Sequence, residues 1–313
     1  MNVTRNTYFK RLQDLSEIDR RVMFVSADCA GLVFEEYRRT HPESFVNVGI
    51  AEQNMIAVSC GLALAGKRPV AYGHAPFATV RALDQIRNCA AMMGLPISIV
   101  VNGIGFAQPY FGATHYNTDD FSAMSLIPGV RIITPSSPSM GIAAADYALL
   151  TKHPLYIRFD PNCDKEIYTK HNIDFSKGFQ ILHQGETVAV VTSAGYTHRL
   201  LALAEEWRSN GVDATIIDVY SVPYDTARLL DAVGSQPIVV VDEQTTYGSL
   251  GARLLCDLNT YGLRNPVWVL GIDFGDSYPD MSTIDNSYFQ QVYGLTDDAI
   301  TAAVTEAANS VRN

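Results

Sequence analysis

The chain has 313 residues, enough for two domains that each bury their own core. Its 23 Lys and Arg residues against 33 Asp and Glu residues leave a net charge of -10, which argues against nucleic-acid binding because phosphate contacts need a basic surface. No apolar run is long enough to span a bilayer and no basic, cleavable leader stands at the start, so we expect a soluble protein of the cytoplasm.

In chain order, the first half alternates between helical and strand patterns. Tyr8, Leu12 and Leu15 recur at helical spacing and predict a helix that ends near residue 19. Buried strands are expected at 22–28, 45–48, 69–72, 97–101, 131–134 and 155–159, and helices at 52–65, 78–93 and 139–150. This alternation predicts a mostly parallel sheet covered by helices on both faces.

The apolar periodicity is lost between residues 163 and 185, where the chain becomes polar and charged. A second α/β unit follows, with strands expected at 187–193, 214–219, 237–242 and 267–272 and helices at 198–208, 225–233, 251–261 and from 297. The fold class is therefore α/β, with two three-layer α/β/α domains at 1–165 and 185–313 joined by a linker at 166–184.

The five cysteines are scattered along the chain and mostly flanked by apolar residues: Cys29, Cys60, Cys89, Cys163 and Cys256. They lack the paired spacing of a zinc site, and their number is odd. We interpret them as reduced core thiols and expect no metal site in this chain.

The most informative segment is 45–54, Phe-Val-Asn-Val-Gly-Ile-Ala-Glu-Gln-Asn, in which a short strand runs into a helix that starts near Glu52. Strand-to-helix junctions are where α/β proteins place their chemistry. Residues 55–66 are small and apolar, so we expect this helix to be buried nearly all round and Glu52 to have a partner. A structural role is the alternative, because an acidic residue in a first helical turn complements the helix dipole.

Three further side chains stand where chemistry is expected. Phe77 follows a strand at the start of the next helix, which suits either stacking on a flat ring or core packing. His115 ends the segment Phe-Gly-Ala-Thr-His and can move protons near neutral pH. Arg158, at the end of an apolar strand, can hold a phosphate or form a salt bridge at a sheet edge.

Several segments resemble thiamine-diphosphate enzymes of the transketolase and deoxyxylulose-phosphate synthase group. Gly-Ile-Ala-Glu-Gln-Asn at 49–54 is similar to their glutamate segment, and Gly-Ala-Thr-His at 112–115 to their Gly-x-Thr-His segment. The region around Phe77 is also similar to beta subunits of 2-oxo acid dehydrogenases. The remaining similar segments are 61–63, 69–70, 84–86, 249–251 and 292–296.

The resemblance implies a pyrimidine-binding domain of the thiamine-diphosphate type, followed by a transketolase C-terminal-like domain. It implies that Glu52 hydrogen-bonds the aminopyrimidine ring of the cofactor and that Phe77 lies against this ring. Asp28 and Ile50 are predicted as further cofactor contacts.

On the substrate side, the resemblance implies that His115 faces the reacting end of the substrate and that Arg158 holds its phosphate. Phe111 and His74 are predicted to line the same pocket.

The resemblance fails at two positions that bear on the substrate. Phe111 occupies the place of a carboxylate that would contact sugar hydroxyls, and Asn102-Gly103 replaces a basic residue that helps to bind phosphate. We therefore expect a pocket that is less polar and less positive than a standard sugar-phosphate site.

Enzymes of this group bind the diphosphate through a metal in a second module marked by Gly-Asp-Gly. No Gly-Asp-Gly occurs in this sequence, which resembles the carboxy-terminal half of a transketolase nearly end to end. We expect a split enzyme in which an N-terminal (alpha) subunit holds the diphosphate and Mg²⁺ or Ca²⁺. The cofactor would lie at the interface of an alpha2beta2 heterotetramer.

The sequence is interpreted first as the beta subunit of a split transketolase that moves a two-carbon ketol unit from a ketose, or its phosphate, to an aldehyde. A decarboxylating synthase and a 2-oxo acid dehydrogenase beta subunit are the alternatives among enzymes. A non-catalytic scaffold subunit is the alternative from another class. The presence of Glu52, Phe77 and His115 argues against a scaffold. The lack of the acidic and basic substrate contacts argues for one.

Overall fold

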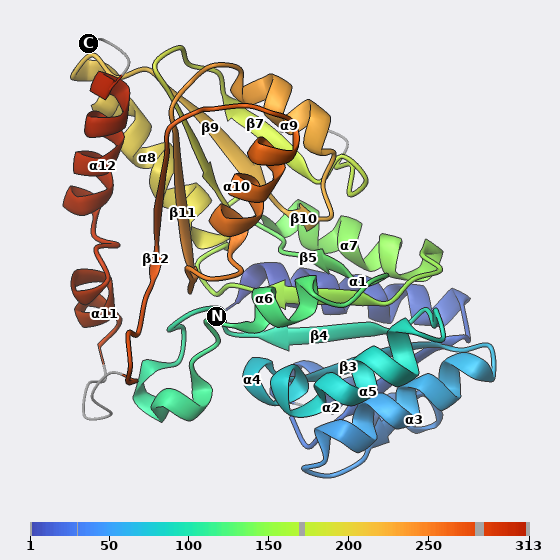
Figure 1. Ribbon diagram of the computed structural model, residues 1–313. Coiled ribbons are helices and arrows are strands. Elements are labelled where there is room, and N and C mark those ends of the chain that lie inside the picture. Colours follow the sequence, from blue (N-terminus) through green and yellow to red (C-terminus); the bar gives the residue numbers. More distant parts are fainter. Residues whose placement is uncertain (1, 30, 169–172, 279–284, 311–313) are drawn as a thin grey trace. The chain divides into compact units, whose positions relative to one another are not determined.

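The computed structural model describes residues 2–29, 31–168, 173–278 and 285–310. The chain forms two compact units, each of which is an α/β domain (Figure 1). Unit 1 comprises Met1–Ile104 and Ala123–Ile173, and unit 2 comprises Gly105–Ser122 and Asp174–Asn313. The predicted fold class is confirmed. The segment 105–122, which lies inside the range predicted for the first domain, belongs to unit 2.

Unit 1 is built on a parallel sheet whose strands follow the order β5-β6-β4-β3-β1-β2. Every residue of β1 and of β6 is buried, as expected for strands covered on both faces. The bounds are β1 (Val22–Ser26), β2 (Phe45–Asn47), β3 (Arg68–His74), β4 (Ser98–Asn102), β5 (Arg131–Ile133) and β6 (Leu155–Phe159).

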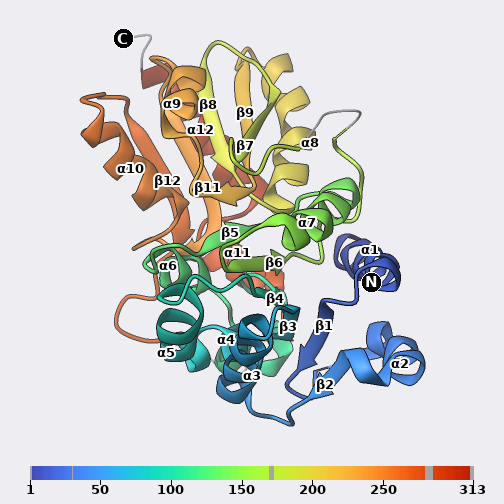
Figure 2. The same cartoon turned by 90° about the vertical axis from the view of Figure 1, so that its right-hand side faces the viewer.

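Helices cover both faces of this sheet. Figures 1 and 2 show α1 and α7 side by side on one face and α3 to α5 on the other. Asn2 caps α1 by accepting a hydrogen bond from the backbone N–H of Arg5 at 2.9 Å. The bounds are α1 (Val3–Ile18), α2 (Gly31–Thr40), α3 (Glu52–Leu64), α4 (Ala75–Ala78), α5 (Leu83–Gln85) and α7 (Pro138–Leu150). Helix α6 (Asp120–Ser125) includes the boundary between the two units, which falls after Ser122.

The helix predicted at 78–93 is broken into short pieces. After α4 the chain forms a 3₁₀ turn at Val80–Ala82, then α5, and then a π-helical turn at Ile86–Ala91. Further 3₁₀ turns lie at Pro42–Ser44, Pro109–Phe111 and Ala113–His115. π-Helical turns are rare and occur frequently at functional sites. Helices α2 and α6 were not predicted.

The prediction that α3 is buried nearly all round is wrong. Its inward side carries buried Met55, Ile56 and Cys60, but Leu64 on the other side is 63% exposed. We call the exposed apolar side the α3 face; it consists of Ala57, Gly61 and Leu64. The error has a physical cause, since a uniformly apolar helix gives no sequence signal that separates a core side from an apolar surface.

Unit 2 contains a five-stranded sheet in the order β12-β11-β8-β9-β7, parallel except for β7 at the edge. Its strands are β7 (Phe179–His183), β8 (Val188–Thr192), β9 (Ala214–Val219), β11 (Ile238–Thr245) and β12 (Val267–Ile272), and the chain of this unit also forms β10 (Ser221–Val222). Strand β7 lies within the range predicted as a linker, because an edge strand that is only partly buried lacks the apolar run of a central strand.

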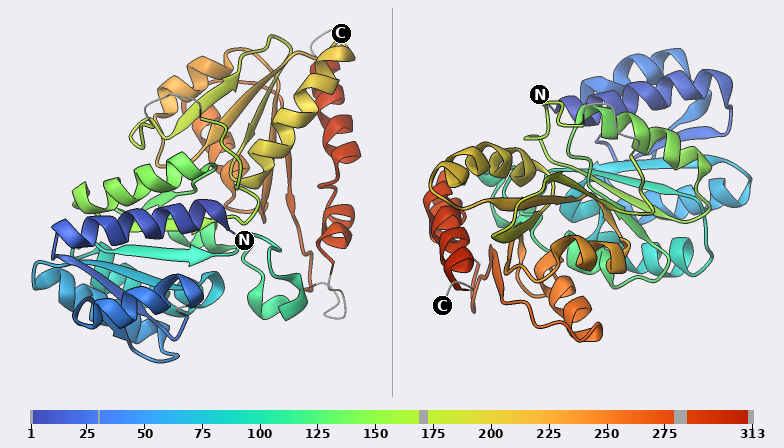
Figure 3. Two further views of the ribbon diagram at one scale, coloured as in Figure 1. Left: turned by 180° about the vertical axis from the view of Figure 1, so that it is seen from behind. Right: turned by 90° about the horizontal axis from the view of Figure 1, so that it is seen from above.

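The helices of unit 2 also cover both faces of its sheet. In Figure 3, α8 and α12 lie on one face and α9 and α10 on the other. The bounds are α8 (Gly195–Ser209), α9 (Thr226–Val233), α10 (Leu250–Thr260), α11 (Asn286–Val292) and α12 (Asp297–Ser310). Helix α11 was not predicted.

All five cysteines are free thiols. Cys60 and Cys163 are buried, but Cys256 is exposed, so the prediction of a core position is wrong for Cys256. Burial raises the pKa of the Cys60 thiol to about 12, which makes it unreactive near neutral pH. In the part of the chain that the structure describes, no helix has the length and apolar character needed to cross a membrane.

Candidate functional site

The carboxyl ends of the parallel strands of unit 1 meet at one edge of the sheet. The chain places β2 on one side of β1 and then β3 on the other side, so the strand order reverses at β1. Such a switch point, at the carboxyl ends of the strands, is where open α/β sheets bind ligands. Asp28, Glu52 and Phe77 lie on the segments that follow these strands, and His74 is the last residue of β3.

Glu52 is the first residue of α3 and only 5% exposed. Its Oε2 lies 2.9 Å from Nη1 of Arg81, whose own side chain is 47% exposed. A buried carboxylate thus has a charged partner, as its burial demands. The sequence pointed to the need for a partner but not to Arg81, because the 3₁₀ turn that presents this arginine was not foreseen.

Phe77 lies against the same arginine. The guanidinium carbon of Arg81 is 4.2 Å from the centroid of the Phe77 ring, a cation–π contact. The His74 ring meets Phe77 edge to face, with centroids 6.4 Å apart and an interplanar angle of 82°. We call Glu52, Arg81, Phe77 and His74 the Glu52 cluster.

The chemistry of the Glu52 cluster suits a flat, nitrogen-containing ring. A carboxyl group can accept a hydrogen bond from a ring nitrogen or donate one to it, and the half-buried Phe77 ring offers an apolar face for stacking. These two groups therefore fit the aminopyrimidine that the resemblance implies. The roles of Glu52, Phe77 and His74 in binding stay predictions.

Asn47, at the end of β2, ties together the two turns that flank the Glu52 cluster. Its Oδ1 accepts hydrogen bonds from the backbone N–H of Asp28 at 3.1 Å and of Gly49 at 3.0 Å. Its Nδ2 donates to Oδ1 of Asp28 at 3.0 Å. Asp28 has φ 60°, which is uncommon for a residue with a side chain, so the hydrogen bonds from Asn47 help to hold this turn. Gly49 has φ 75°, which glycine adopts at no steric cost.

Sequence reasoning missed Asn47, although it stands in the segment 45–54. The available signal was an asparagine two residues before a glycine, which is typical of turns. Asp28 is exposed and Ile50 is 79% exposed. Both are thus accessible to a ligand, and their predicted cofactor contacts stay predictions.

Arg5 is a second basic residue at this edge that was not predicted. Its Nη1 donates to the Tyr72 hydroxyl at 3.2 Å, near the end of β3. Burial raises the pKa of the Cys29 thiol to about 11, with the charge of Arg5 opposing this shift and that of Glu52 adding to it. Arg5 and Glu52 are therefore both close enough to Cys29 for their charges to act on it. A lone arginine in the first turn of a helix gave no sequence signal.

Arg158 does not lie at a sheet edge, as its salt-bridge alternative required. It belongs to β6, which pairs with both β4 and β5. Its side chain is 1% exposed. The phosphate contact predicted for Arg158 stays a prediction.

His115 and Phe111 belong to unit 2, in the segment 105–122. Nδ1 of His115 lies 3.0 Å from the Thr114 hydroxyl, and the Phe111 ring packs on the imidazole with centroids 4.7 Å apart. Partial burial lowers the pKa of His115, which keeps the imidazole neutral at neutral pH. Since Glu52 belongs to unit 1, the predicted meeting of His115 with Glu52 stays a prediction.

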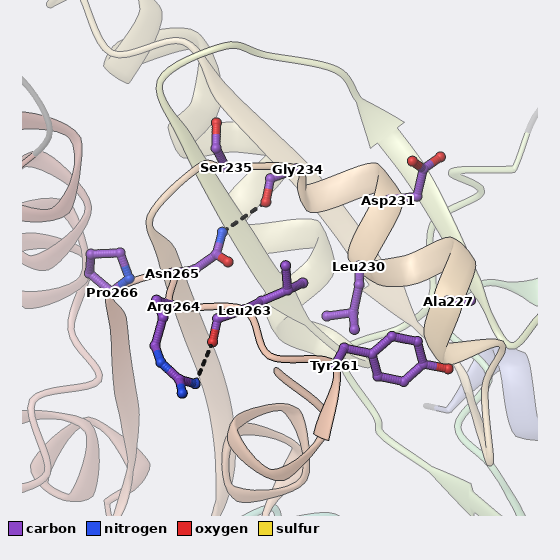
Figure 4. A pocket seen from close by; sticks show the side chains of 10 residues that line it. All are labelled: Ala227, Leu230, Asp231, Gly234, Ser235, Tyr261, Leu263, Arg264, Asn265 and Pro266. Atoms are coloured by element: carbon purple, nitrogen blue, oxygen red, sulfur yellow. Dashed lines mark hydrogen bonds between the residues drawn. The ribbon is translucent and has the colours of Figure 1, made fainter. Parts of the chain in front are cut away.

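A hollow of about 790 Å³ lies in unit 2, between α9 and the loop after α10 (Figure 4). Asn265 uses its Nδ2 to bind the carbonyl of Gly234 at 2.9 Å, so its amide holds the loop in place. None of the predicted site residues lines this hollow. Within the described ranges, no group of three or more His, Cys, Asp or Glu side chains could hold a metal ion.

Two family models match successive parts of the sequence, and the first of them includes the segment 105–122, which lies in unit 2. The family model described as "Transketolase, pyrimidine binding domain" matches residues 2–162. The one described as "Transketolase, C-terminal domain" matches residues 178–300.

Several proteins are similar to this chain over part or nearly all of their length. The 6-deoxy-6-sulfo-D-fructose transketolase subunit SqwH of Clostridium sp. (strain MSTE9) is 28% identical, covering 97% of this chain and 95% of that protein. An apulose-4-phosphate transketolase subunit of Actinobacillus succinogenes is 30% identical, covering 67% and 68%. The 1-deoxy-D-xylulose-5-phosphate synthase of Chlamydia muridarum is 29% identical, covering 94% of this chain and 46% of the synthase.

Among solved structures, a split-gene transketolase that forms an inactive β4 tetramer superposes with a TM-score of 0.82. It is 26% identical and covers 98% of both chains.

Proposed function

The chain belongs to the transketolase family, and we propose that it is the C-terminal (beta) subunit of a split transketolase. The complete enzyme would transfer a two-carbon ketol unit from a ketose, or a ketose phosphate, to an aldehyde. The observation that carries this proposal is the buried carboxylate of Glu52, which shares Arg81 with the Phe77 ring at the carboxyl edge of the sheet. The similar split transketolase subunits support the same assignment.

Thiamine diphosphate, when bound, would supply the nucleophilic carbon and the electron sink for this reaction. In this chain, Glu52 would hold a proton at a carboxyl oxygen toward a nitrogen of the pyrimidine ring. Phe77 would present its ring to the flat face of that heterocycle, and Asn47 would keep the turn before Glu52 in place. When the cofactor binds, the Glu52 carboxyl group would exchange Arg81 for the cofactor ring as its partner.

The partner would be an N-terminal (alpha) subunit that carries Gly-Asp-Gly and holds Mg²⁺ or Ca²⁺ with the diphosphate. The α3 face supports a partner on this side of unit 1, because apolar side chains such as Leu64, 63% exposed, favour burial. Ile50 is 79% exposed just before the same helix. We propose an alpha2beta2 assembly in the cytoplasm, and we expect this chain to be inactive without its partner.

The substrate pocket would be less polar than a standard sugar-phosphate site. Tyr110 and Phe111 lie with ring centroids 4.5 Å apart and are 62% and 52% exposed. These two rings lie near His115 and present mostly apolar surface. A sugar with several hydroxyl groups would need polar partners at this place. We propose a substrate with fewer hydroxyl groups at this end.

A decarboxylating synthase is the second candidate. The similar deoxyxylulose-phosphate synthase supports it, and Gly112-Ala113-Thr114-His115 resembles a segment found in both groups. The two activities differ in the donor, which is a ketose for the transferase and a 2-oxo acid for the synthase.

Supplying the reconstituted pair with each donor in turn tests the proposal. With thiamine diphosphate, Mg²⁺ and an aldehyde acceptor, we expect a set of ketoses and ketose phosphates to give two-carbon transfer without release of carbon dioxide. Carbon dioxide release from pyruvate, with every ketose left unchanged, would reject the transfer reaction in favour of the synthase.

A further inference from the structure

The segment 105–122 is closed on itself inside unit 2. Gly105 and Asn117 exchange both backbone hydrogen bonds, each at 2.9 Å, as a two-residue antiparallel bridge. Residues 106–116 thus form a loop whose ends are held together. His115 and Phe111 lie within this loop.

The end of strand β11 holds the segment 105–122 through Gln244, which is fully buried. Its Nε2 donates to the carbonyl oxygen of Asn117 at 3.1 Å, and its Oε1 accepts from the backbone N–H of Phe121 at 3.4 Å. The next residue, Thr245, donates its backbone N–H to the carbonyl of Thr118 at 2.6 Å. Gln244 therefore bonds the segment 105–122 once as a donor and once as an acceptor, and a methionine side chain of similar length can make neither bond.

Aromatic packing fixes the other side of the loop. Phe106 stacks on Phe289 of α11 with centroids 4.1 Å apart and an interplanar angle of 10°. Tyr116, the neighbour of His115, packs against Phe289 with centroids 5.3 Å apart. Phe106 and Tyr116 are 1% and 4% exposed and belong to the hydrophobic core of unit 2. Both residues next to the bridge are thus anchored in that core.

We propose that Gln244 is a positioning residue, through which the C-terminal domain sets the place of His115. This inference rests on the function proposed above, in which His115 faces the substrate. Asn117, the residue that Gln244 binds, lies two positions after His115, so a shift there moves the imidazole. In an enzyme, a misplacement of about 1 Å can cost about 10²-fold in rate. Strand β11 would then contribute to catalysis although it carries no catalytic residue itself.

The fit at Gly105 supports a fixed position for the loop. Gly105 has φ 56°, and a Cβ on it would stand 2.2 Å from Oε2 of Glu243, the residue before Gln244. A side chain there would strain the backbone, because φ is positive, and would displace the side chain of Glu243. Gly105→Ala is therefore a second way to displace the loop, and it leaves Gln244 in place.

Gln244→Met tests the role of Gln244 because it keeps the length of the side chain and removes both hydrogen bonds. In the full chain, we expect hydrogen–deuterium exchange of the backbone amides in 105–122 to rise by about tenfold or more, since their closed state loses hydrogen bonds. In the reconstituted pair, kcat/KM for the ketose donor should fall by about 10- to 100-fold while the affinity for thiamine diphosphate stays within about twofold. Gly105→Ala should change both quantities in the same direction.

Gln236→Met is the matched control. Gln236 stands just before β11, at its opposite end, and its Nε2 donates to the carbonyl of Gly185 at 3.0 Å. This variant should leave both the exchange of 105–122 and kcat/KM unchanged.

Two results would overturn the proposal. One is exchange of 105–122 that is no faster in Gln244→Met than in Gln236→Met. The other is faster exchange with kcat/KM unchanged in an active pair. A wild-type pair that transfers no ketol unit would refute the proposed function instead, so the two failures are distinguishable.

Discussion

The Glu52→Gln variant of the reconstituted pair is expected to lose about 10²–10⁴-fold in kcat, the usual contribution of a positioned acid–base group. Glutamine keeps the shape and hydrogen-bonding reach of the side chain but cannot give up or take up a proton at the ring nitrogen. Steady-state assay of ketol transfer with saturating cofactor measures the effect.

The same variant should fold normally. Glutamine can still accept a hydrogen bond from Arg81, and the charge that remains on Arg81 stays in contact with water, because its side chain is 47% exposed. Glu43→Gln, which changes an exposed carboxylate of the same unit, is the control. If Glu52→Gln keeps the activity of the wild type, the chain is a scaffold subunit and the proposed role of Glu52 is wrong.

The His115→Ala variant is expected to lose about 10²-fold or more in kcat/KM for the ketose donor, because it removes the group proposed to hydrogen-bond and move protons at the reacting end. The affinity for thiamine diphosphate should stay unchanged, since the cofactor contacts are predicted on unit 1. Initial rates at several donor concentrations, with a parallel cofactor titration, separate the two quantities. A control is His153→Ala, which removes an exposed histidine.

The pH profile adds a second check on His115. Burial lowers its pKa, so the imidazole is neutral at neutral pH and gains its proton only below the usual histidine range. If the neutral imidazole is the working form, kcat/KM should fall on the acid side at a pH below about 6.5, the ordinary pKa of histidine. This limb should disappear in His115→Ala. An identical acid limb in the variant would assign it to another group.

Much of the fold could be predicted because it depends on local pattern. Central strands such as 155–159 and 188–192 are mostly apolar, and in α1 the buried apolar residues recur at helical spacing. Glu52 was placed correctly at the first position of its helix, since the strand, the turn and the helix follow each other within ten residues.

The parts that were missed depend on contacts distant in sequence. Phe106 and Tyr116 look like ordinary aromatic residues of the first domain, yet they pack on Phe289, far along the chain. The spacing of apolar residues in the sequence does not indicate which of two hydrophobic cores an aromatic residue packs into. For the same reason, the sequence could not show that the segment 105–122 leaves the first domain and joins unit 2.

The partner of Glu52 was missed for a related reason. Arg81 reaches Glu52 only because the chain leaves the α-helical path at Val80–Ala82. A pattern of helical spacing predicts a regular helix through this region and so places the arginine elsewhere. Sequence analysis could therefore identify the buried carboxylate but not the cation beside it.

The central claim is that Glu52 binds the pyrimidine ring of thiamine diphosphate in a site that a second polypeptide completes. Calorimetric titration of thiamine diphosphate and Mg²⁺ into this chain, into the Gly-Asp-Gly partner and into their mixture tests it most directly. We expect one cofactor bound per pair of chains in the mixture and no comparable binding by this chain alone. Binding of equal strength to this chain alone, or none by an assembled mixture, would contradict the account.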